Sequence, residues 1–207
     1  GPTGNVLWTS DFEHFIRSSS PMADMDLDGD NEIVGIDNHG LAKILDAGTG
    51  AVEWKGYVGY CAGSTPAIGD LDGDGFGEVV FSMCVSGGMV VLNHDSTLLW
   101  QRDDNTRFYS SPTLIDVDGD GIEDVINTDV VTYTVLAYKG TNGGLLWSTT
   151  LPNTTWAQGS LVSVDIDGDG MIEIMAGSDS GLYSLNSQDG RVEWFFPTGR
   201  VRGEPFV

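Results

Sequence analysis

Closely spaced aspartates followed by glycine occur four times in this 207-residue chain, always in the same order. The four segments read DMDLDGDNE from residue 24, DLDGDGFGE from residue 70, DVDGDGIED from residue 116 and DIDGDGMIE from residue 165. All of them fit D-x-D-x-D-G-x-x-[DE], which places carboxylates at loop positions 1, 3, 5 and 9. Because alternate carboxylates in a tight turn point toward a common centre, the pattern predicts binding of a hard cation through oxygen atoms.

Calcium is the cation that this ligand chemistry favours. Ca²⁺ accepts about six to eight oxygen ligands in a flexible geometry, whereas Mg²⁺ keeps several of its waters and is rarely enclosed by protein ligands alone. Zinc is disfavoured because no His or Cys recurs in the loops. The alternative is four solvated acidic turns without metal, in which crowded carboxylates would repel one another. We therefore expect Ca²⁺ as the cofactor, with one ion for each of the four loops.

Each loop is predicted to bind its ion through the side chains at positions 1, 3, 5 and 9. Position 7, whose side chains share no chemistry, is expected to contribute its backbone carbonyl (Asp30, Phe76, Ile122, Met171). The glycine at position 6 permits the sharp bend, commonly with a positive φ. The predicted metal-binding residues are Asp24, Asp26, Asp28, Asp30, Glu32, Asp70, Asp72, Asp74, Phe76, Glu78, Asp116, Asp118, Asp120, Ile122, Asp124, Asp165, Asp167, Asp169, Met171 and Glu173.

A short apolar segment follows every loop and indicates a β-strand. These segments cover residues 33–36, 79–81, 125–126 and 174–176, and they are rich in Val and Ile. No helical periodicity follows, so a helix–loop–helix calcium site is disfavoured. Each loop is instead expected to join two strands.

A repeat of about 46 residues organises the whole chain. The first aspartates of the loops are spaced by 46, 46 and 49 residues, and the tryptophans at 8, 54, 100, 147 and 194 keep nearly the same interval. A repeat of roughly 40–50 residues is typical of propeller blades or solenoids. In the second repeat we expect strands at about 58–69, 78–85, 88–93 and 97–101, and four antiparallel strands make one propeller blade. The recurring tryptophan is expected to pack between blades.

The predicted fold class is therefore all-β: a β-propeller of four-stranded antiparallel blades. Residues 1–207 form a single propeller domain or a propeller segment, with repeats at about 9–54, 55–100, 101–147 and 148–194. Residues 1–8 and 195–207 are interpreted as partial blades. Three arrangements fit these ends: a fragment of a larger propeller, a five-bladed ring closed by both termini, or terminal strands that pair with another molecule.

On these loops and this period, the sequence resembles the FG-GAP and VCBS-type calcium-binding β-propeller repeats. This class includes the integrin α-subunit propeller and many bacterial and archaeal surface proteins. The similarity runs from about Val6 to Val207, although only Phe76-Gly77 and Ser64-Thr65-Pro66-Ala67 correspond to the integrin-style tags. The resemblance implies a module at the cell surface or outside the cell. The blade ending at 47–54 is also similar to the Trp-ended blades of quinoprotein propellers.

Charge and composition limit the partners. The net charge is −22 with only nine Lys and Arg, which argues against nucleic acid and anionic lipid. No apolar run approaches the roughly 20 residues that a membrane span needs, so membrane insertion is not expected. We expect a protein, a glycan or a second copy of the chain as partner.

Cysteine usage and a sequon agree with an extracellular location. Cys61 and Cys84 fall on strands that flank the second loop, and an antiparallel pairing of residue 67 with 79 would make them near neighbours. A disulfide is therefore predicted, with two buried thiols as the alternative. Asn153-Thr154-Thr155 is a glycosylation sequon, which makes Asn153 a candidate acceptor in a glycosylating secretory route.

Catalytic motifs do not stand out. His14, His39 and His94 occupy unrelated positions and are expected to be surface turn residues, and no Ser-His-Asp set or phosphate loop is recognised. We expect a non-enzymatic module for adhesion, partner binding or structural assembly. The alternatives are a calcium-dependent polysaccharide-active enzyme of the lyase type, which needs a base such as Lys43, Lys55 or Lys139, and a self-assembling component of a surface filament or layer.

Overall fold

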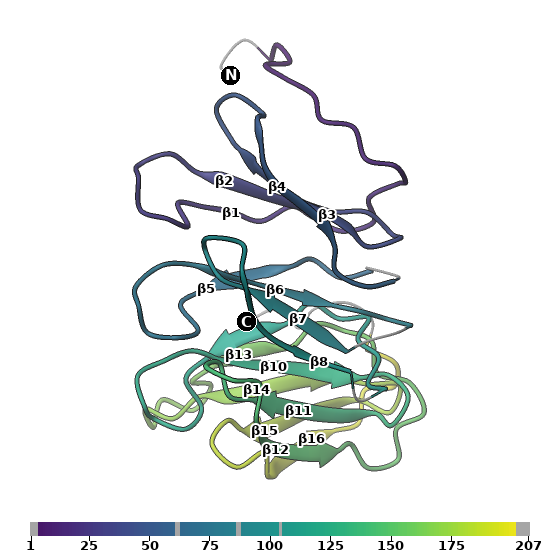
Figure 1. Cartoon of the computed structure of the whole chain (residues 1–207). Helices are drawn as coiled ribbons and strands as arrows, with labels where there is room; N and C mark the ends of the chain where they lie inside the picture. Colours follow the sequence, from purple (N-terminus) through teal and green to yellow (C-terminus); the bar gives the residue numbers. More distant parts are fainter. Residues whose placement is uncertain (1–3, 61–62, 86–87, 104, 202–207) are drawn as a thin grey trace.

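Sixteen β-strands and no helix make up the described part of the chain, residues 4–60, 63–85, 88–103 and 105–201 of a computed structural model (Figure 1). The strands are β1 (Met22–Ala23), β2 (Glu32–Ile36), β3 (Leu41–Asp46), β4 (Val52–Tyr57), β5 (Ala67–Gly69), β6 (Glu78–Ser82), β7 (Met89–Leu92), β8 (Leu98–Arg102), β9 (Thr113–Ile115), β10 (Asp124–Asp129), β11 (Thr134–Tyr138), β12 (Leu145–Thr150), β13 (Val162–Val164), β14 (Glu173–Gly177), β15 (Leu182–Asn186) and β16 (Val192–Phe196). No helix that could cross a membrane occurs among these residues.

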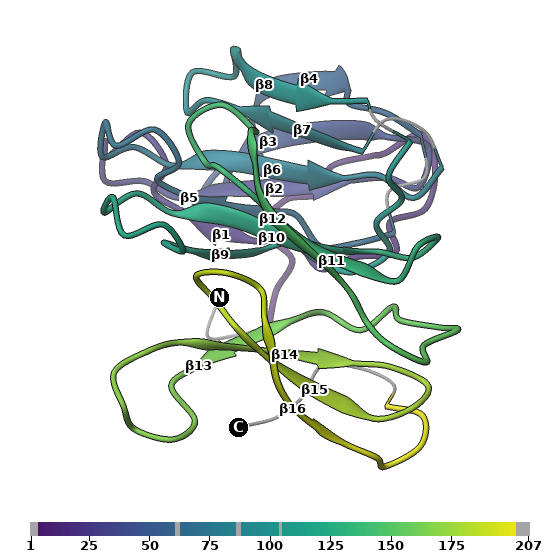
Figure 2. The ribbon, with the colours of Figure 1, turned by 90° about the horizontal axis from the view of Figure 1, so that it is seen from below.

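Four consecutive strands form each sheet, so every sheet is an antiparallel meander. The sheets are β1–β4, β5–β8, β9–β12 and β13–β16, which we name blades 1 to 4. This arrangement confirms the predicted all-β class of four-stranded antiparallel blades. The blades follow one another in space in the order of the sequence (Figures 1 and 2). Within the described residues no core cluster joins blade 4 to blade 1, so the four blades do not close into a ring.

The two middle strands of each blade are buried on both faces. For example, all five residues of β6 and of β11 are buried. A strand packed on both faces needs apolar or small residues at every position rather than at alternate ones. Three core clusters result, one at each contact between successive blades, and their members include Phe81, Tyr138 and Tyr183.

The repeated tryptophan locks one blade to the next, which confirms the prediction of packing between blades. In Trp8, Trp100 and Trp147 the indole N–H donates to a backbone carbonyl in the turn between the third and fourth strands of the following blade. The donor and acceptor pairs are Trp100 Nε1 to Gly140 O (2.5 Å), Trp147 Nε1 to Ser187 O (2.8 Å) and Trp8 Nε1 to Ala47 O (2.9 Å). The N-terminal segment therefore supplies to blade 1 the contact that blade 2 supplies to blade 3.

Glycine in the receiving turn makes room for the rings of Trp8, Trp100 and Trp147, whereas blade 2 has Ser96 at this position with φ of 65°. Gly143 has φ of 67° and Gly190 has φ of 70°, and a Cβ on either would lie within 2.7 Å of a tryptophan ring carbon. A side chain there would be strained by its backbone and would also clash with the ring. The tryptophan of one blade and the glycine of the next blade therefore form a single packing contact.

The first strand of blade 2 is shorter than the sequence predicts. In blade 2 only Ala67–Gly69 forms a strand, whereas 58–69 was expected, and Ala67 pairs with Val80 rather than with residue 79. The preceding residues must carry the chain from the fourth strand of one sheet to the first strand of the next. These residues therefore cannot all pair with one neighbouring strand.

The interpretation of the two ends as partial blades stays a prediction. Residues 5–8 form no strand, and residues 195–196 belong to β16. The Val201 N–H donates to Ser178 O, as the Phe108 N–H donates to Met83 O on the way into blade 3. The backbone bond of Val201 to blade 4 is therefore equivalent to the bond of Phe108 to blade 2. Residues 202–207 are outside the described residues.

Candidate metal centre

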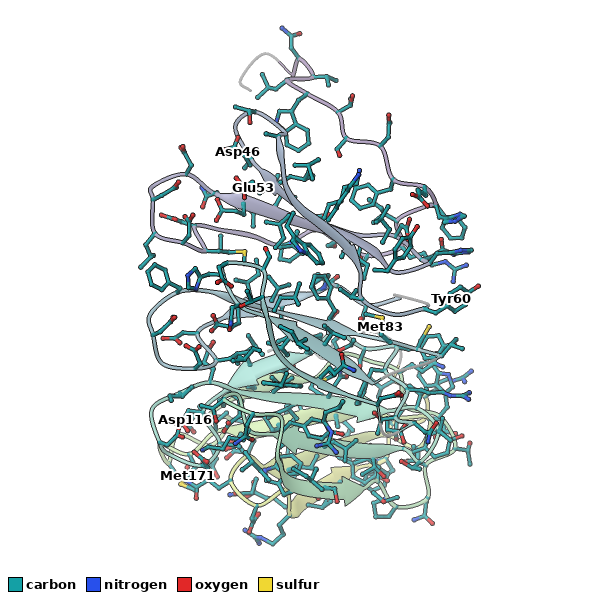
Figure 3. All side chains as sticks on the ribbon, in the orientation of Figure 1. Asp46, Glu53, Tyr60, Met83, Asp116 and Met171 are labelled. Carbon is teal, nitrogen blue, oxygen red and sulfur yellow. The ribbon has the colours of Figure 1, made fainter. Side chains whose placement is uncertain are left out.

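The four acidic loops lie on one side of the molecule, at the left of Figure 1. Each joins the first strand of its blade to the second, as predicted. Figure 3 labels Asp116 and Met171, which belong to the loops of blades 3 and 4 on this same side. We number the loops 1 to 4 with their blades.

The aspartate at position 1 closes every loop by accepting backbone hydrogen bonds. In loop 2, Asp70 Oδ2 accepts from the Gly75 N–H at 3.1 Å and Asp70 Oδ1 accepts from the Gly73 N–H at 2.7 Å. Loops 3 and 4 repeat both contacts at 2.7 to 3.0 Å. The glycine at position 6 has a positive φ in all four loops, which allows the N–H to turn back toward position 1.

Positions 3 and 5 are held by short local hydrogen bonds. Asp72 Oδ1 accepts from the Asp74 N–H at 3.0 Å, and Asp74 Oδ1 accepts from the Phe76 N–H at 2.9 Å. The other loops form the same pair of contacts. These Asx-type turns fix one oxygen of each carboxylate toward the backbone and orient the other away from it.

Position 9 supplies a buried carboxylate at the first residue of the second strand. Its exposed fraction is 6% for Glu32, 0% for Glu78, 1% for Asp124 and 2% for Glu173. In loop 2, Glu78 Oε2 accepts from the Leu71 N–H at 2.8 Å, and each other loop has the equivalent bond. A carboxylate buried this deeply needs a hydrogen-bond or ionic partner for each oxygen.

The structure brings positions 1, 3 and 9 together in every loop. One oxygen from each of these three carboxylates lies within 4.8 Å of the other two, in the groups Asp24–Asp26–Glu32, Asp70–Asp72–Glu78, Asp116–Asp118–Asp124 and Asp165–Asp167–Glu173. The aspartates at position 5 are not members of these groups, and their role as ligands stays a prediction, as does that of the position 7 carbonyls. Two oxygens of these groups, Asp24 Oδ1 and Glu78 Oε1, are buried without a hydrogen-bond partner. The donor set therefore fits a cation held by oxygen.

Burial and crowding raise the pKa of the position 9 carboxyl groups of Glu32, Glu78 and Asp124. Burial raises the pKa of Glu78 to about 7, and the neighbouring carboxylates of Asp70, Asp72 and Asp74 add to the shift. The pKa of Glu32 and that of Asp124 are also raised, mainly by burial. Without a cation these groups resist ionisation, and a bound cation would reverse that preference.

The four loops are not identical. Position 4 is glycine with φ near 80° in loops 2, 3 and 4, but it is Leu27 with φ of 59° in loop 1. In loop 3 the Lys139 ammonium contacts Asp118 Oδ2 at 2.5 Å and Asp120 Oδ2 at 2.6 Å, and these contacts raise the pKa of Lys139. Lys139 thus places a fixed positive charge on a predicted metal-binding loop.

Sequence reasoning missed Lys139 and His94 as neighbours of the loops. Both lie at the turn between the third and fourth strands, 15 residues after Asp124 and 16 after Glu78 respectively. The signal that could have revealed them is the antiparallel pairing of the second and third strands. The third strand ends beside the start of the second strand, so the turn that follows it lies next to the acidic loop. His94 is half-buried rather than a free surface residue, while His14 and His39 stack on each other at 3.6 Å.

The disulfide and glycosylation predictions stay predictions. Cys84 is buried, and Cys61 lies outside the described residues. Asn153 is exposed in a turn with φ of 54°, a position that a glycan could reach.

A cavity of about 450 Å³ lies between the N-terminal segment and blade 1. Lys43 and Lys55, neighbours across β3 and β4, line it together with Phe12 and Tyr57. Lys43 is 9% exposed, its ammonium donates to Asp11 O and it lies over the Phe12 ring. Two of the three lysines therefore converge on one hollow.

The sheets and loops together define the class as a propeller-like all-β protein with acidic loops. Residues 116–176, which span loops 3 and 4, match the FG-GAP-like repeat family. This match agrees with the resemblance that the sequence showed. The comparison with curated protein sequences found no match.

Solved structures with a similar fold support the same class. Bap1, a biofilm matrix protein of V. cholerae, is 23% identical with a TM-score of 0.67 over 88% of this chain and 30% of Bap1. BamB from Moraxella catarrhalis is 17% identical with a TM-score of 0.62 over 91% of this chain and 54% of BamB. The quinohemoprotein alcohol dehydrogenase ADHIIG from Pseudomonas putida HK5 is 13% identical with a TM-score of 0.63 over 92% of this chain and 35% of that enzyme. The chain spans about a third to a half of the length of these neighbours.

Proposed function

We propose that this chain is a calcium-binding extracellular β-propeller module that serves adhesion, partner binding or structural assembly. Ca²⁺ in each loop would be structural: it would neutralise the carboxylates at positions 1, 3 and 9 and pin the turn between the first two strands. The observation that carries the proposal is the buried carboxylate at position 9, repeated four times at the first residue of the second strand. Such a carboxylate is costly to bury unless a cation faces it.

Support for the location and the role comes from the family and from one neighbour. FG-GAP-like repeats match residues 116–176, and Bap1, a biofilm matrix protein, shares the fold. We infer a role without catalysis in which exposed loops bind a protein, a glycan or a second copy of the chain, and in which nucleic acid is excluded by charge.

Metal analysis of the purified chain tests the calcium proposal. We expect four Ca²⁺ ions for each chain, one for each loop, and a marked fall of the melting temperature in EDTA. A ligand at 100 times its Kd stabilises the folded state by about 2.7 kcal/mol, so the combined effect of several sites is easily measured. No Ca²⁺ after dialysis and an unchanged melting temperature in EDTA would overturn the proposal.

Loop 1 offers a matched pair of variants. Asp24→Asn together with Asp26→Asn removes two carboxylates of the convergent group, and we expect the loss of one Ca²⁺. Asp30→Asn removes a carboxylate from the same loop at position 7, where only the backbone carbonyl is expected to bind, so the calcium count should not change. Equal effects of the two changes would show that general acidity, not site geometry, binds the ion.

A second candidate function is supported by the cavity beside blade 1. Lys43 and Lys55, with Tyr57, could act on or bind an acidic glycan, as the lyase alternative requires. Incubation with acidic polysaccharides tests it: a lyase would release unsaturated products that absorb in the ultraviolet, and Lys43→Met or Lys55→Met would abolish them. Binding without product would support the glycan-binding module instead.

A further inference from the structure

Blade 2 differs from the other blades in having an imidazole beside its acidic loop. His94 lies in the turn between β7 and β8, and one ligand atom each of Asp74, Glu78 and His94 lies within 4.8 Å of the other two. We propose that these three residues form a transition-metal site of the zinc type, distinct in chemistry from the all-oxygen sites of the four loops. We call it the His94 site.

The geometry around His94 suits a shared ion better than a direct contact. His94 Nδ1 lies 3.8 Å from Asp74 Oδ2, which is too long for a hydrogen bond. Two ligands of one Zn²⁺, each at about 2.0–2.1 Å from the metal, are separated by roughly 3 to 4 Å. His94 Nδ1 is buried and has no hydrogen-bond partner. The distance and the unsatisfied nitrogen both leave a place for a metal ion.

Glu78, which also belongs to the convergent group of loop 2, likewise lacks a partner for one of its oxygens. Its side chain is completely buried, and its Oε2 is used by the Leu71 N–H. Its Oε1 is buried and has no hydrogen-bond partner. A wholly buried carboxylate oxygen without a partner is unfavourable unless a cation or a proton faces it.

Packing fixes the imidazole ring in this position. The ring of Phe76 stacks on His94 with centroids 4.3 Å apart and an interplanar angle of 29°. Phe76 occupies position 7 of loop 2, where the other loops have Asp30, Ile122 or Met171. A ligand whose orientation is held by packing loses little freedom when it binds a metal.

The corresponding turns of the other blades have no imidazole. Their residues are Ala47 in blade 1, Gly140 in blade 3 and Ser187 in blade 4. Imidazole binds zinc, copper and nickel well, whereas calcium takes oxygen ligands almost exclusively. One imidazole with two carboxylates therefore favours a transition metal at blade 2 alone, and the three other blades serve as internal controls.

The His94 site shares Asp74 and Glu78 with the predicted calcium site of loop 2, but zinc binding at the His94 site does not require calcium in the loop. If the loops bind no calcium, the three ligands are still in place. If they do, Glu78 would bridge two ions or the metals would compete. Zinc binding is therefore measured with calcium present and with calcium absent, so that failure of one proposal is distinguishable from failure of the other.

The test is a titration of the purified chain with Zn²⁺ against a chromophoric chelator, and with Co²⁺ as a spectroscopic probe. We expect one tight site for each chain. With Co²⁺ in this site, the d–d absorption bands should indicate a nitrogen ligand. His94→Ala should weaken that site on the order of 100-fold. His39→Ala, which removes a turn histidine from blade 1, should leave it unchanged.

Two controls keep the result interpretable. His94→Ala should retain the wild-type calcium count and melting temperature in Ca²⁺, which shows that the variant folds. Asp74→Asn should weaken Zn²⁺ binding as His94→Ala does. Equal Zn²⁺ affinity of His94→Ala and the wild type would overturn the proposal, and so would the absence of any tight Zn²⁺ site in the wild type.

Discussion

Replacement of Glu78 by Gln should have opposite effects on stability with and without calcium. Glu78 is wholly buried at the start of β6, and burial raises its pKa from the ordinary 4.5 to about 7. A carboxyl group with a raised pKa in the folded state stabilises the fold fully below pH 4.5. That contribution is lost as the pH rises toward 7, because the folded state then holds a charge it disfavours.

The size of the effect follows from the pKa difference. Each pKa unit corresponds to about 1.4 kcal/mol, so Glu78 alone should lower the unfolding free energy of the calcium-free protein by about 3 kcal/mol between pH 4.5 and 8. Gln is uncharged over this range, and its side-chain oxygen can still accept from the Leu71 N–H. Glu78→Gln should therefore be more stable than the wild type by about 3 kcal/mol at pH 8, relative to their difference at pH 4.5.

Urea unfolding followed by tryptophan fluorescence measures this difference directly. Calcium is removed beforehand, and both proteins are measured at the two pH values. Other groups with a raised pKa, such as Glu32 and Asp124, titrate in both proteins and cancel in the difference. In saturating Ca²⁺ the order should reverse, because Gln cannot replace a carboxylate as a charged ligand. A difference between the proteins that is independent of pH would refute the argument from burial.

Three further outcomes are expected from single changes. Lys139→Met should tighten calcium binding at loop 3 several-fold, because it removes the ammonium that contacts Asp118; isothermal titration with the other loops as reference measures this, and unchanged affinity would contradict it. Trp147→Phe should lower the unfolding free energy by about 1–2 kcal/mol through loss of the hydrogen bond to Ser187 O, and an effect below about 0.5 kcal/mol would argue against the interblade lock. Leu27→Gly should raise the unfolding free energy by up to about 1 kcal/mol, because glycine adopts the positive φ of this position without strain. A lower unfolding free energy in urea denaturation would show that the strain is absent.

The loops and the blades were predictable because their determinants are local. The side-chain hydrogen bonds that shape loop 2 join residues no more than seven apart, so the segment from Asp70 to Glu78 determines most of its own conformation. One backbone bond, from the Gly77 N–H to Met25 O, links the loop to blade 1. The tryptophan interval indicated the interblade contact for a similar reason: a repeated blade meets its neighbour with the same residue each time. The regular spacing of the tryptophans thus allowed a contact between distant residues to be predicted from the sequence alone.

The neighbours of the loops were not predictable in the same way. His94 and Lys139 reach the loops only because the second and third strands pair in register, and a shift of one residue would point them to the other face. The strand prediction for 58–69 was wrong for a related reason. A β-leaning segment that must cross between sheets has no partner for most of its length, and its sequence does not reveal the crossing.

The Trp contact and the acidic loop stabilise different parts of each blade, and neither can replace the other. The indole of Trp147 fixes the turn between the third and fourth strands of the following blade, while loop 4 fixes the turn between the first two strands of that blade. Removal of calcium should therefore loosen the first two strands while the interblade contact persists. In hydrogen exchange with and without EDTA, amides of β13 and the start of β14 should lose protection before those of β15. Uniform loss of protection across the blade would show instead that loop and tryptophan act as one cooperative unit.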